Sequence, residues 1–220
     1  MSSEGKDTFT ESRPRLVLAF SGGAFLYVAV EAAIYVWMPT LLAGHAGGTA
    51  AFAAYSLSIF FLLRAVGRFL GAWMLRHARW QLILMVFGGC ILACFAFTVI
   101  GGIAWGVFLL PLSGLFMSVM YPTINSKGIS CAHKADHGAA AGVILFFTCV
   151  SAVVSPLMIG AAGDAFGNII YGYWLASGFA VLLCGASVLN WALNPTRAIL
   201  EERDTAEYVT RDPTDLYSSS

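Results

Sequence analysis

The sequence predicts an all-α membrane protein built from six transmembrane helices, and three observations support this prediction. Hydrophobic residues make up 59% of the chain and charged residues only 11%, a balance unlike that of soluble domains. Six apolar segments are each long enough to cross a bilayer as a helix, which takes about 20 residues. These segments lack the polar and apolar alternation of outer-membrane barrels, so we expect helices that satisfy their own backbone hydrogen bonds.

The predicted spans follow one another with short connections. They cover residues 16–42, 49–75, 80–100, 103–125, 138–162 and 169–193. We expect residues 1–15 to form a cytoplasmic arm and the acidic residues 194–220 to form a disordered cytoplasmic tail. Outside the spans, Lys and Arg occur in the arm, in the second and fourth connections and in the tail. The positive-inside rule therefore predicts a multi-pass protein with both termini in the cytoplasm.

The first predicted span carries Glu31 about midway along its length. An ionised carboxylate at that depth is costly unless it faces water or a partner, so we expect it to bind protons or substrate. The structural alternative is a neutral side chain packed against another helix. Tyr27 and Tyr35 each lie four residues away on the same helix face, where they either line a binding site or fill the core. We expect Trp37 to lie at the outer membrane interface.

The second predicted span carries two arginines, Arg64 and Arg68, one helical turn apart. We expect the long side chain of Arg64 to extend toward the cytoplasmic surface. The alternative is a salt bridge with Glu31, or a gate that changes its partner. Arg68, beside Gly67 and Gly71, is expected to be structural.

No metal site or cofactor is predicted. In the third span, Cys90 and Cys94 share a helix face, but no His, Asp or Glu in that span could complete a site with them. The four histidines lie in connections between spans, and even His133 and His137, four residues apart, have no third metal ligand beside them. The other two are His45 and His77.

Candidate residues also occur at the ends of the fourth and fifth spans. Pro122 is expected to kink the fourth helix and to expose carbonyl groups beside Tyr121 and Asn125, which share a face. Both could bind substrate, although Asn125 could equally cap the end of the helix. Pro156 interrupts the fifth span, and Asp164 beyond it is expected to cap a turn or to close an outer gate.

Four local strings, in this order, connect the chain with a known family. They are FLYVAVEAAIYVW (25–37), GRFLGAWMLRHAR (67–79), SVMYPTINSKGIS (118–130) and SPLMIGAAGDAFGNI (155–169). Together they resemble the carboxy-terminal half of the fucose/galactose/hexose proton symporter family, a branch of the major facilitator superfamily. Two departures stand out: Pro156 lies one residue further from Asp164, and the acidic residue usual near Arg68 is missing.

The resemblance implies a six-helix half of a major facilitator bundle, built as a 3+3 inverted repeat. Family members have two such halves with the substrate between them, so we expect a six-helix amino-terminal half or a second copy of this chain as partner. The family often carries Glu or Gln at the position of Glu31, which favours a role in sugar binding.

The implied function is that of a secondary active transporter in the inner membrane, not an enzyme. It would take up a sugar such as fucose, galactose or glucose by alternating access, with the proton as coupling ion and no cofactor. We expect the lipid bilayer as its surroundings and no nucleic-acid partner. The alternative is a non-transporting membrane subunit or the truncated remnant of a split transporter gene.

Overall fold

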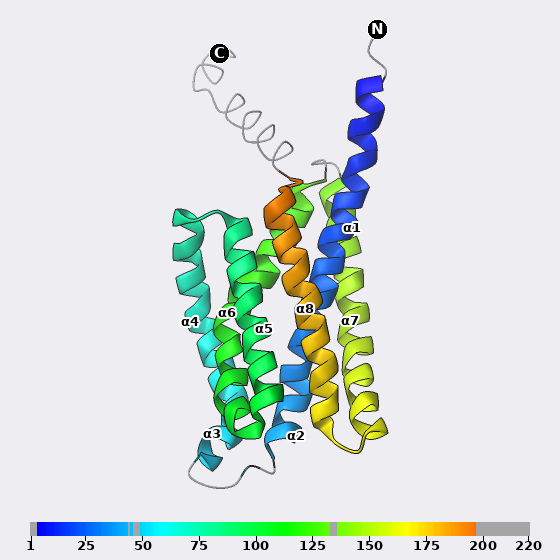
Figure 1. Ribbon diagram of the computed structural model, residues 1–220. Helices are drawn as coiled ribbons and strands as arrows, with labels where there is room; N and C mark the ends of the chain where they lie inside the picture. The colour runs from blue at the N-terminus through cyan, green and yellow to red at the C-terminus, as the bar shows by residue number, and fades with distance from the viewer. Residues whose placement is uncertain (1–3, 44, 46–48, 133–135, 197–220) are drawn as a thin grey trace.

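A computed structural model describes residues 4–43, 45, 49–132 and 136–196, with side chains from Pro14 onward (Figure 1). Within these residues the chain forms helices and turns and no β-strand. The elements are α1 (Glu4–Ala32), the π-helix η1 (Ala33–Trp37), α2 (Met38–Leu42), α3 (Ala50–Ala54), α4 (Ser56–His77), α5 (Trp80–Gly101), α6 (Ile103–Ser130), α7 (His137–Ala165) and α8 (Ile169–Leu193).

Six of these helical stretches are long and apolar enough to cross a membrane, which confirms the predicted six-span, all-helical class. Their bounds differ from the predicted ones in places. The helix α1 begins at Glu4, inside the predicted arm, and α6 continues to Ser130. The predicted second span is divided at Tyr55 into the short α3 and the long α4. Of the predicted tail, residues 197–220 lie outside the described part of the chain.

The helices run alternately up and down and interlock as two sets of three (Figure 1). The first set is α1, α4 and α5, and the second is α6, α7 and α8. The first helix of each set packs mainly against the second helix of the other set: α1 against α7, and α6 against α4. The third helices, α5 and α8, pack against each other. This exchange is the arrangement expected of a 3+3 repeat.

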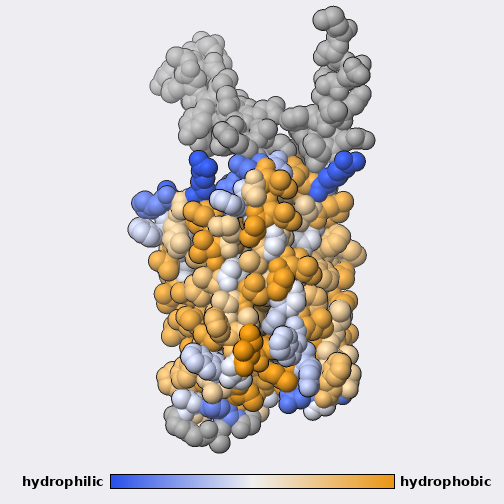
Figure 2. Space-filling view, in the orientation of Figure 1, coloured by the Kyte–Doolittle hydropathy of each residue, from blue (hydrophilic) through white to orange (hydrophobic). Residues whose placement is uncertain are grey.

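Basic residues gather at one end of the bundle, which we call the basic end. There α1, α5 and α7 begin and α4, α6 and α8 end, and it carries Arg15, Arg76, Arg79 and Lys127. Figure 2 shows hydrophilic residues in blue at this end, at the top of the view, above a broad apolar belt in orange. An apolar belt with a polar rim is what a bilayer requires of a spanning bundle.

The helices differ in how deeply they are buried. For each span, the buried share is taken over its most apolar stretch of 18 residues. This share is 61% in the first span and 56% in α6. It is only 17% in α4 and 22% in α7. The helices α1 and α6 therefore form the centre of the bundle, whereas α4 and α7 lie at its sides.

Glycine brings α4 and α6 into backbone contact. A Cβ atom on Gly67 would lie 2.5 Å from the carbonyl oxygen of Leu115, and one on Gly114 would lie 2.5 Å from the carbonyl oxygen of Phe60. Such close approach is a common way for helices to associate in membranes. Because α4 is held so closely, the side chains on its inward face reach the centre of the bundle.

Candidate functional site

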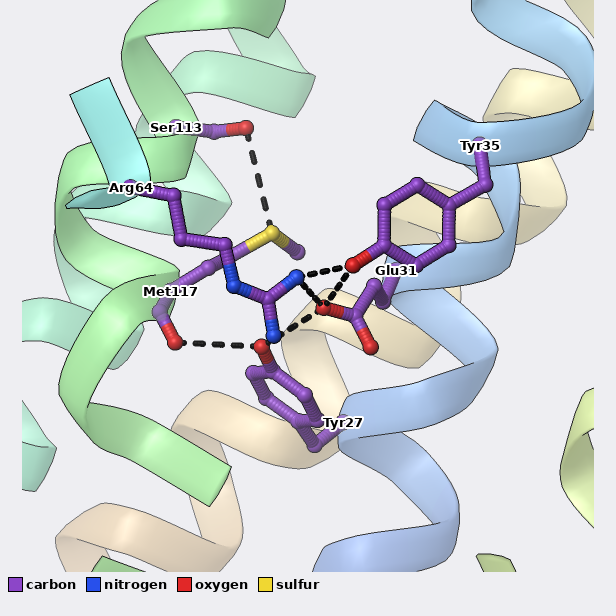
Figure 3. A network of polar contacts seen from close by, with 6 residues as sticks. All are labelled: Tyr27, Glu31, Tyr35, Arg64, Ser113 and Met117. Carbon is purple, nitrogen blue, oxygen red and sulfur yellow. Dashed lines mark hydrogen bonds and ion pairs between the residues drawn. The ribbon is translucent and has the colours of Figure 1, made fainter. Parts of the chain in front are cut away.

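The carboxylate of Glu31 is the centre of a buried polar cluster at the end of α1 (Figure 3). Its Oε1 accepts hydrogen bonds from the hydroxyl groups of Tyr27, at 2.9 Å, and Tyr35, at 2.8 Å. The four-residue spacing places all three side chains on one face of the helix, as predicted. The same Oε1 forms an ion pair with Nη1 of Arg64, which reaches across from α4.

The prediction that Arg64 extends toward the membrane surface is therefore wrong, and the alternative of a salt bridge with Glu31 is what the structure contains. The physical reason is that Glu31 is buried, and a buried carboxylate left without a partner would be more costly than the desolvation of the guanidinium that pairs with it. The guanidinium of Arg64 also makes cation–π contacts with two aromatic rings. Its central carbon lies 5.8 Å from the ring centroid of Tyr35 and 6.0 Å from that of Phe60. The Nε of Arg64 is buried without a hydrogen-bond partner.

The helix widens into the π-helix η1 directly after this cluster. Two hydrogen bonds fasten it to the second set of helices: the hydroxyl of Tyr173 in α8 donates to the carbonyl of Ala33 at 2.7 Å, and the indole of Trp37 in η1 donates to the carbonyl of Pro156 in α7 at 3.0 Å. Trp37 thus binds α7 through its indole, and its place at the outer membrane interface stays a prediction. Short π segments are frequent at functional sites because they reorient the side chains around them.

A pocket of about 380 Å³ lies beside the cluster and is open on one side. Its polar lining comes from four of the six spans and comprises Glu31, Tyr35, Arg64, Tyr121 and Thr148. Apolar residues complete the wall, namely Val28, Ala32, Val36, Ala152 and Pro156. Toward the opening, Tyr35 exposes 36% of its surface, whereas Glu31 exposes 8%.

Of the two candidates on α6, the structure brings only Tyr121 to the pocket. Its ring lies 5.8 Å from that of Tyr27. Asn125 does not line the pocket and does not cap a helix end, because α6 continues through Pro122 to Ser130. The expectation that the helix ends near Asn125 is thus wrong: in the middle of a long helix, a proline bends the chain without stopping it.

The two remaining charged candidates lie outside the pocket. Arg68 is one turn nearer the basic end than Arg64 and lines a different cavity. Asp164 lies in the last turn of α7 with an exposed side chain, and its backbone carbonyl accepts the hydrogen bond of Gly167 N–H at 3.2 Å. The turn after α7 is therefore closed by the backbone of Asp164.

Sequence reasoning missed Thr148 on α7 and the backbone carbonyl of Met117, which lies 3.0 Å from the Tyr27 hydroxyl. The spacing of Thr148, Ala152 and Pro156 by four places them on one helix face, but the spacing does not show which helix that face meets. No comparable signal marks Met117, since any residue has a carbonyl group. In the part of the chain that the structure describes, no three His, Cys, Asp or Glu side chains come together as metal ligands.

Comparison with curated proteins finds transporters. The chain is 32% identical to the L-fucose-proton symporter of Escherichia coli over 154 residues, which cover 66% of this chain and 33% of the symporter. It is 31% identical to a glucose/galactose transporter of Brucella abortus over 150 residues, covering 66% of this chain and 35% of the transporter. The chain thus spans about a third of the length of these relatives.

Solved structures show the same fold. The E. coli fucose:proton symporter FucP superposes with a TM-score of 0.72 and 24% identity, over 83% of this chain and 45% of FucP. A second structure of FucP, in the outward conformation, matches with a TM-score of 0.72 and 25% identity, over 80% of this chain and 42% of that one. These relatives confirm the resemblance predicted from the four strings.

The family model described as Major Facilitator Superfamily matches residues 5–156, which is more than half of the chain. Proteins of this family are transporters, not enzymes, and they need no cofactor for transport. By this match, the chain belongs to the Major Facilitator Superfamily.

Proposed function

We propose that this chain is one six-helix half of a proton-coupled sugar transporter. The observation that carries the proposal is the polar pocket at mid-depth of the bundle, in which Glu31 is paired with Arg64 and flanked by tyrosines. Polar and ionisable groups at this depth are costly and usually serve transport. The names of the relatives supply the substrate class, a sugar such as fucose, galactose or glucose.

The chemistry of the pocket suits a neutral sugar. Because Glu31 and Arg64 neutralise each other, the pocket offers hydrogen-bond donors and acceptors without a net charge. The rings of Tyr35 and Tyr121 supply apolar surfaces against which a sugar ring can pack, and their hydroxyls supply polar contacts. A volume of about 380 Å³ lies within the range of small-molecule sites.

The contacts of Tyr27 support Glu31 as the site of the coupling proton. The Tyr27 hydroxyl has one proton but lies within hydrogen-bond distance of two acceptors, Glu31 Oε1 and the carbonyl of Met117. It can donate to only one of them while Glu31 is ionised. When Glu31 is protonated, it can donate to Tyr27, and Tyr27 can then donate to Met117. Binding of a proton would thus satisfy both contacts and loosen the hold of Glu31 on Arg64.

A partner must cover the open side of the pocket. Polar groups facing hydrocarbon are unfavourable, and the poorly buried helices α4 and α7 contribute Arg64 and Thr148 to this pocket. We propose that a six-helix amino-terminal half, or a second copy of this chain, packs against these two helices. The relatives, which are about twice as long, supply the precedent.

The test of the proposal is sugar binding by the chain assembled with its partner, measured by isothermal titration with L-fucose, D-galactose and D-glucose. Loss of ring packing in Tyr121→Ala should weaken binding of the preferred sugar by about tenfold, a loss of roughly 1.4 kcal/mol. Asn125→Ala is the matched control on the same helix and should bind as the unchanged protein does. Failure of every assembly to bind any sugar would contradict the proposal and favour a non-transporting subunit.

We further propose that the basic end faces the cytoplasm of a cell whose inner membrane holds the protein, as its cationic residues favour. Maleimide labelling of single cysteines in a cysteine-free background tests this orientation. Asp164→Cys, at the opposite end, should react in intact cells. Arg76→Cys should react only after the cells are made permeable, and the reverse pattern would contradict the proposed orientation.

A further inference from the structure

A second pocket, of about 560 Å³, lies at the basic end between α4, α6 and the start of α5. It shares no lining residue with the pocket at Glu31. Its polar lining consists of cations and hydroxyl groups: Arg68, Arg79, Lys127, Ser118, Thr123 and Ser126. The hydroxyl of Ser118 already donates to the carbonyl of Leu115 at 2.7 Å, which leaves Thr123 and Ser126 as the hydroxyl donors.

The positive charge of this pocket is not balanced within the described residues. No carboxylate lines it, and the ion pair that the described part of the chain contains, Glu31 with Arg64, lies in the other pocket. Arg68 and Arg79 are exposed, and Lys127 is held with its Nζ 5.8 Å from the centroid of the Trp80 ring. Cations that converge on one cavity repel each other unless an anion joins them, so the arrangement points to an anionic ligand.

The remaining lining residues restrict the source of that anion. They are apolar, namely Ala72, Leu75, Ala78, Trp80, Val119 and Pro122. The pocket also lies where α4 ends and α5 begins, at the level at which a span meets the membrane surface. A free phosphate ion would leave these apolar walls unfilled, whereas a phospholipid has both an anionic head and an apolar tail.

We propose that this pocket binds an anionic phospholipid. The phosphate oxygens would accept hydrogen bonds from Arg68, Arg79 and Lys127, and an acyl chain would lie along the apolar walls formed by α4 and α6. Basic pockets between membrane helices recognise anionic headgroups in this way. Binding would fasten α4, which carries Arg64, to α6, which carries Tyr121.

Native mass spectrometry of the purified full chain, with phosphatidylglycerol and phosphatidylcholine offered in equal amounts, tests the proposal. One phosphatidylglycerol should be retained per chain in preference to phosphatidylcholine. Arg68→Gln and Arg79→Gln should each weaken its retention by about fivefold, as expected for the loss of one basic contact at the membrane surface. Both residues are exposed, so neither replacement disturbs the core. Arg76→Gln is the matched control, because Arg76 lies on α4 but does not line the pocket.

Four results would overturn the proposal. Equal retention of the two lipids would do so, and so would an equal loss in Arg76→Gln, which would indicate attraction by surface charge alone. If inorganic phosphate at millimolar concentration displaces the lipid from the unchanged protein but has no effect on Arg68→Gln, the ligand is a soluble phosphate. If a six-helix partner removes the preference for phosphatidylglycerol, the cations face protein and not lipid.

Discussion

A single carboxylate, Glu31, contacts three side chains inside the bundle. It accepts hydrogen bonds from two tyrosine hydroxyls and forms an ion pair with Arg64. The cost of burying it is offset because Arg64 brings the opposite charge and two tyrosine hydroxyls satisfy the same oxygen. The Nε of Arg64 remains buried without a partner, so the hydrogen bonding of the guanidinium is incomplete. The pairing with Glu31 therefore stabilises the cluster without satisfying every donor in it.

A double-mutant cycle measures this pairing. Glu31→Gln and Arg64→Gln should each lower the free energy of unfolding by about 1–3 kcal/mol, because each leaves a buried partner unsatisfied. The double variant should lose less than the sum, with a coupling energy of about 0.5–3 kcal/mol. Unfolding in detergent provides the measurement, and strictly additive losses would show that the two side chains do not interact.

The sequence predicted part of this site and not the rest, for reasons that differ between residues. The common face of Tyr27, Glu31 and Tyr35 follows from helical spacing alone. The direction of Arg64 does not, because its long side chain can reach either the surface or the bundle centre, and the choice depends on where α4 packs. Thr148 could be assigned to the pocket only once α7 was known to lie beside α1.

Among the elements, the first span is not one uniform helix, and its π-helical segment holds the side chains around Glu31 in place. Tyr173 and Trp37 fasten that segment to α8 and α7. Hydropathy predicts the existence of the spans, but it cannot predict a π segment or the break at Tyr55, which change no composition. It also could not predict that α6 passes through Pro122.

The close contact of α4 with α6 can be tested with two glycines. Gly67→Ala should destabilise the protein by about 1–3 kcal/mol, because the added methyl group would meet the Leu115 carbonyl at 2.5 Å. Gly142→Ala is the control in α7, where a Cβ would have nothing within 4 Å, and it should be neutral or stabilise the helix by roughly 0.5–1 kcal/mol. Unfolding temperatures in one detergent provide the comparison. Equal temperatures for the two variants would argue against close packing at Gly67.

Taken as a whole, the molecule is a bundle with a buried centre, α1 and α6, and two poorly buried sides, α4 and α7. The class and the number of spans could be predicted from composition and hydropathy. The pairing of α1 with α7 and of α6 with α4 could be expected only from the resemblance to a family built as a 3+3 repeat, because apolar faces by themselves do not specify which neighbour they meet in a membrane. It is this pairing that assembles the pocket from four spans and leaves one side of it open.

Sugar accumulation in proteoliposomes tests the central proposal most directly. The chain, reconstituted with a six-helix partner or as two copies, should concentrate fucose, galactose or glucose when an inward proton gradient is imposed. Accumulation should stop when the gradient is dissipated. Glu31→Gln should still exchange sugar across the membrane but no longer accumulate it, because a glutamine cannot bind the coupling proton. Folded assemblies that show neither uptake nor exchange of any of these sugars would contradict the account.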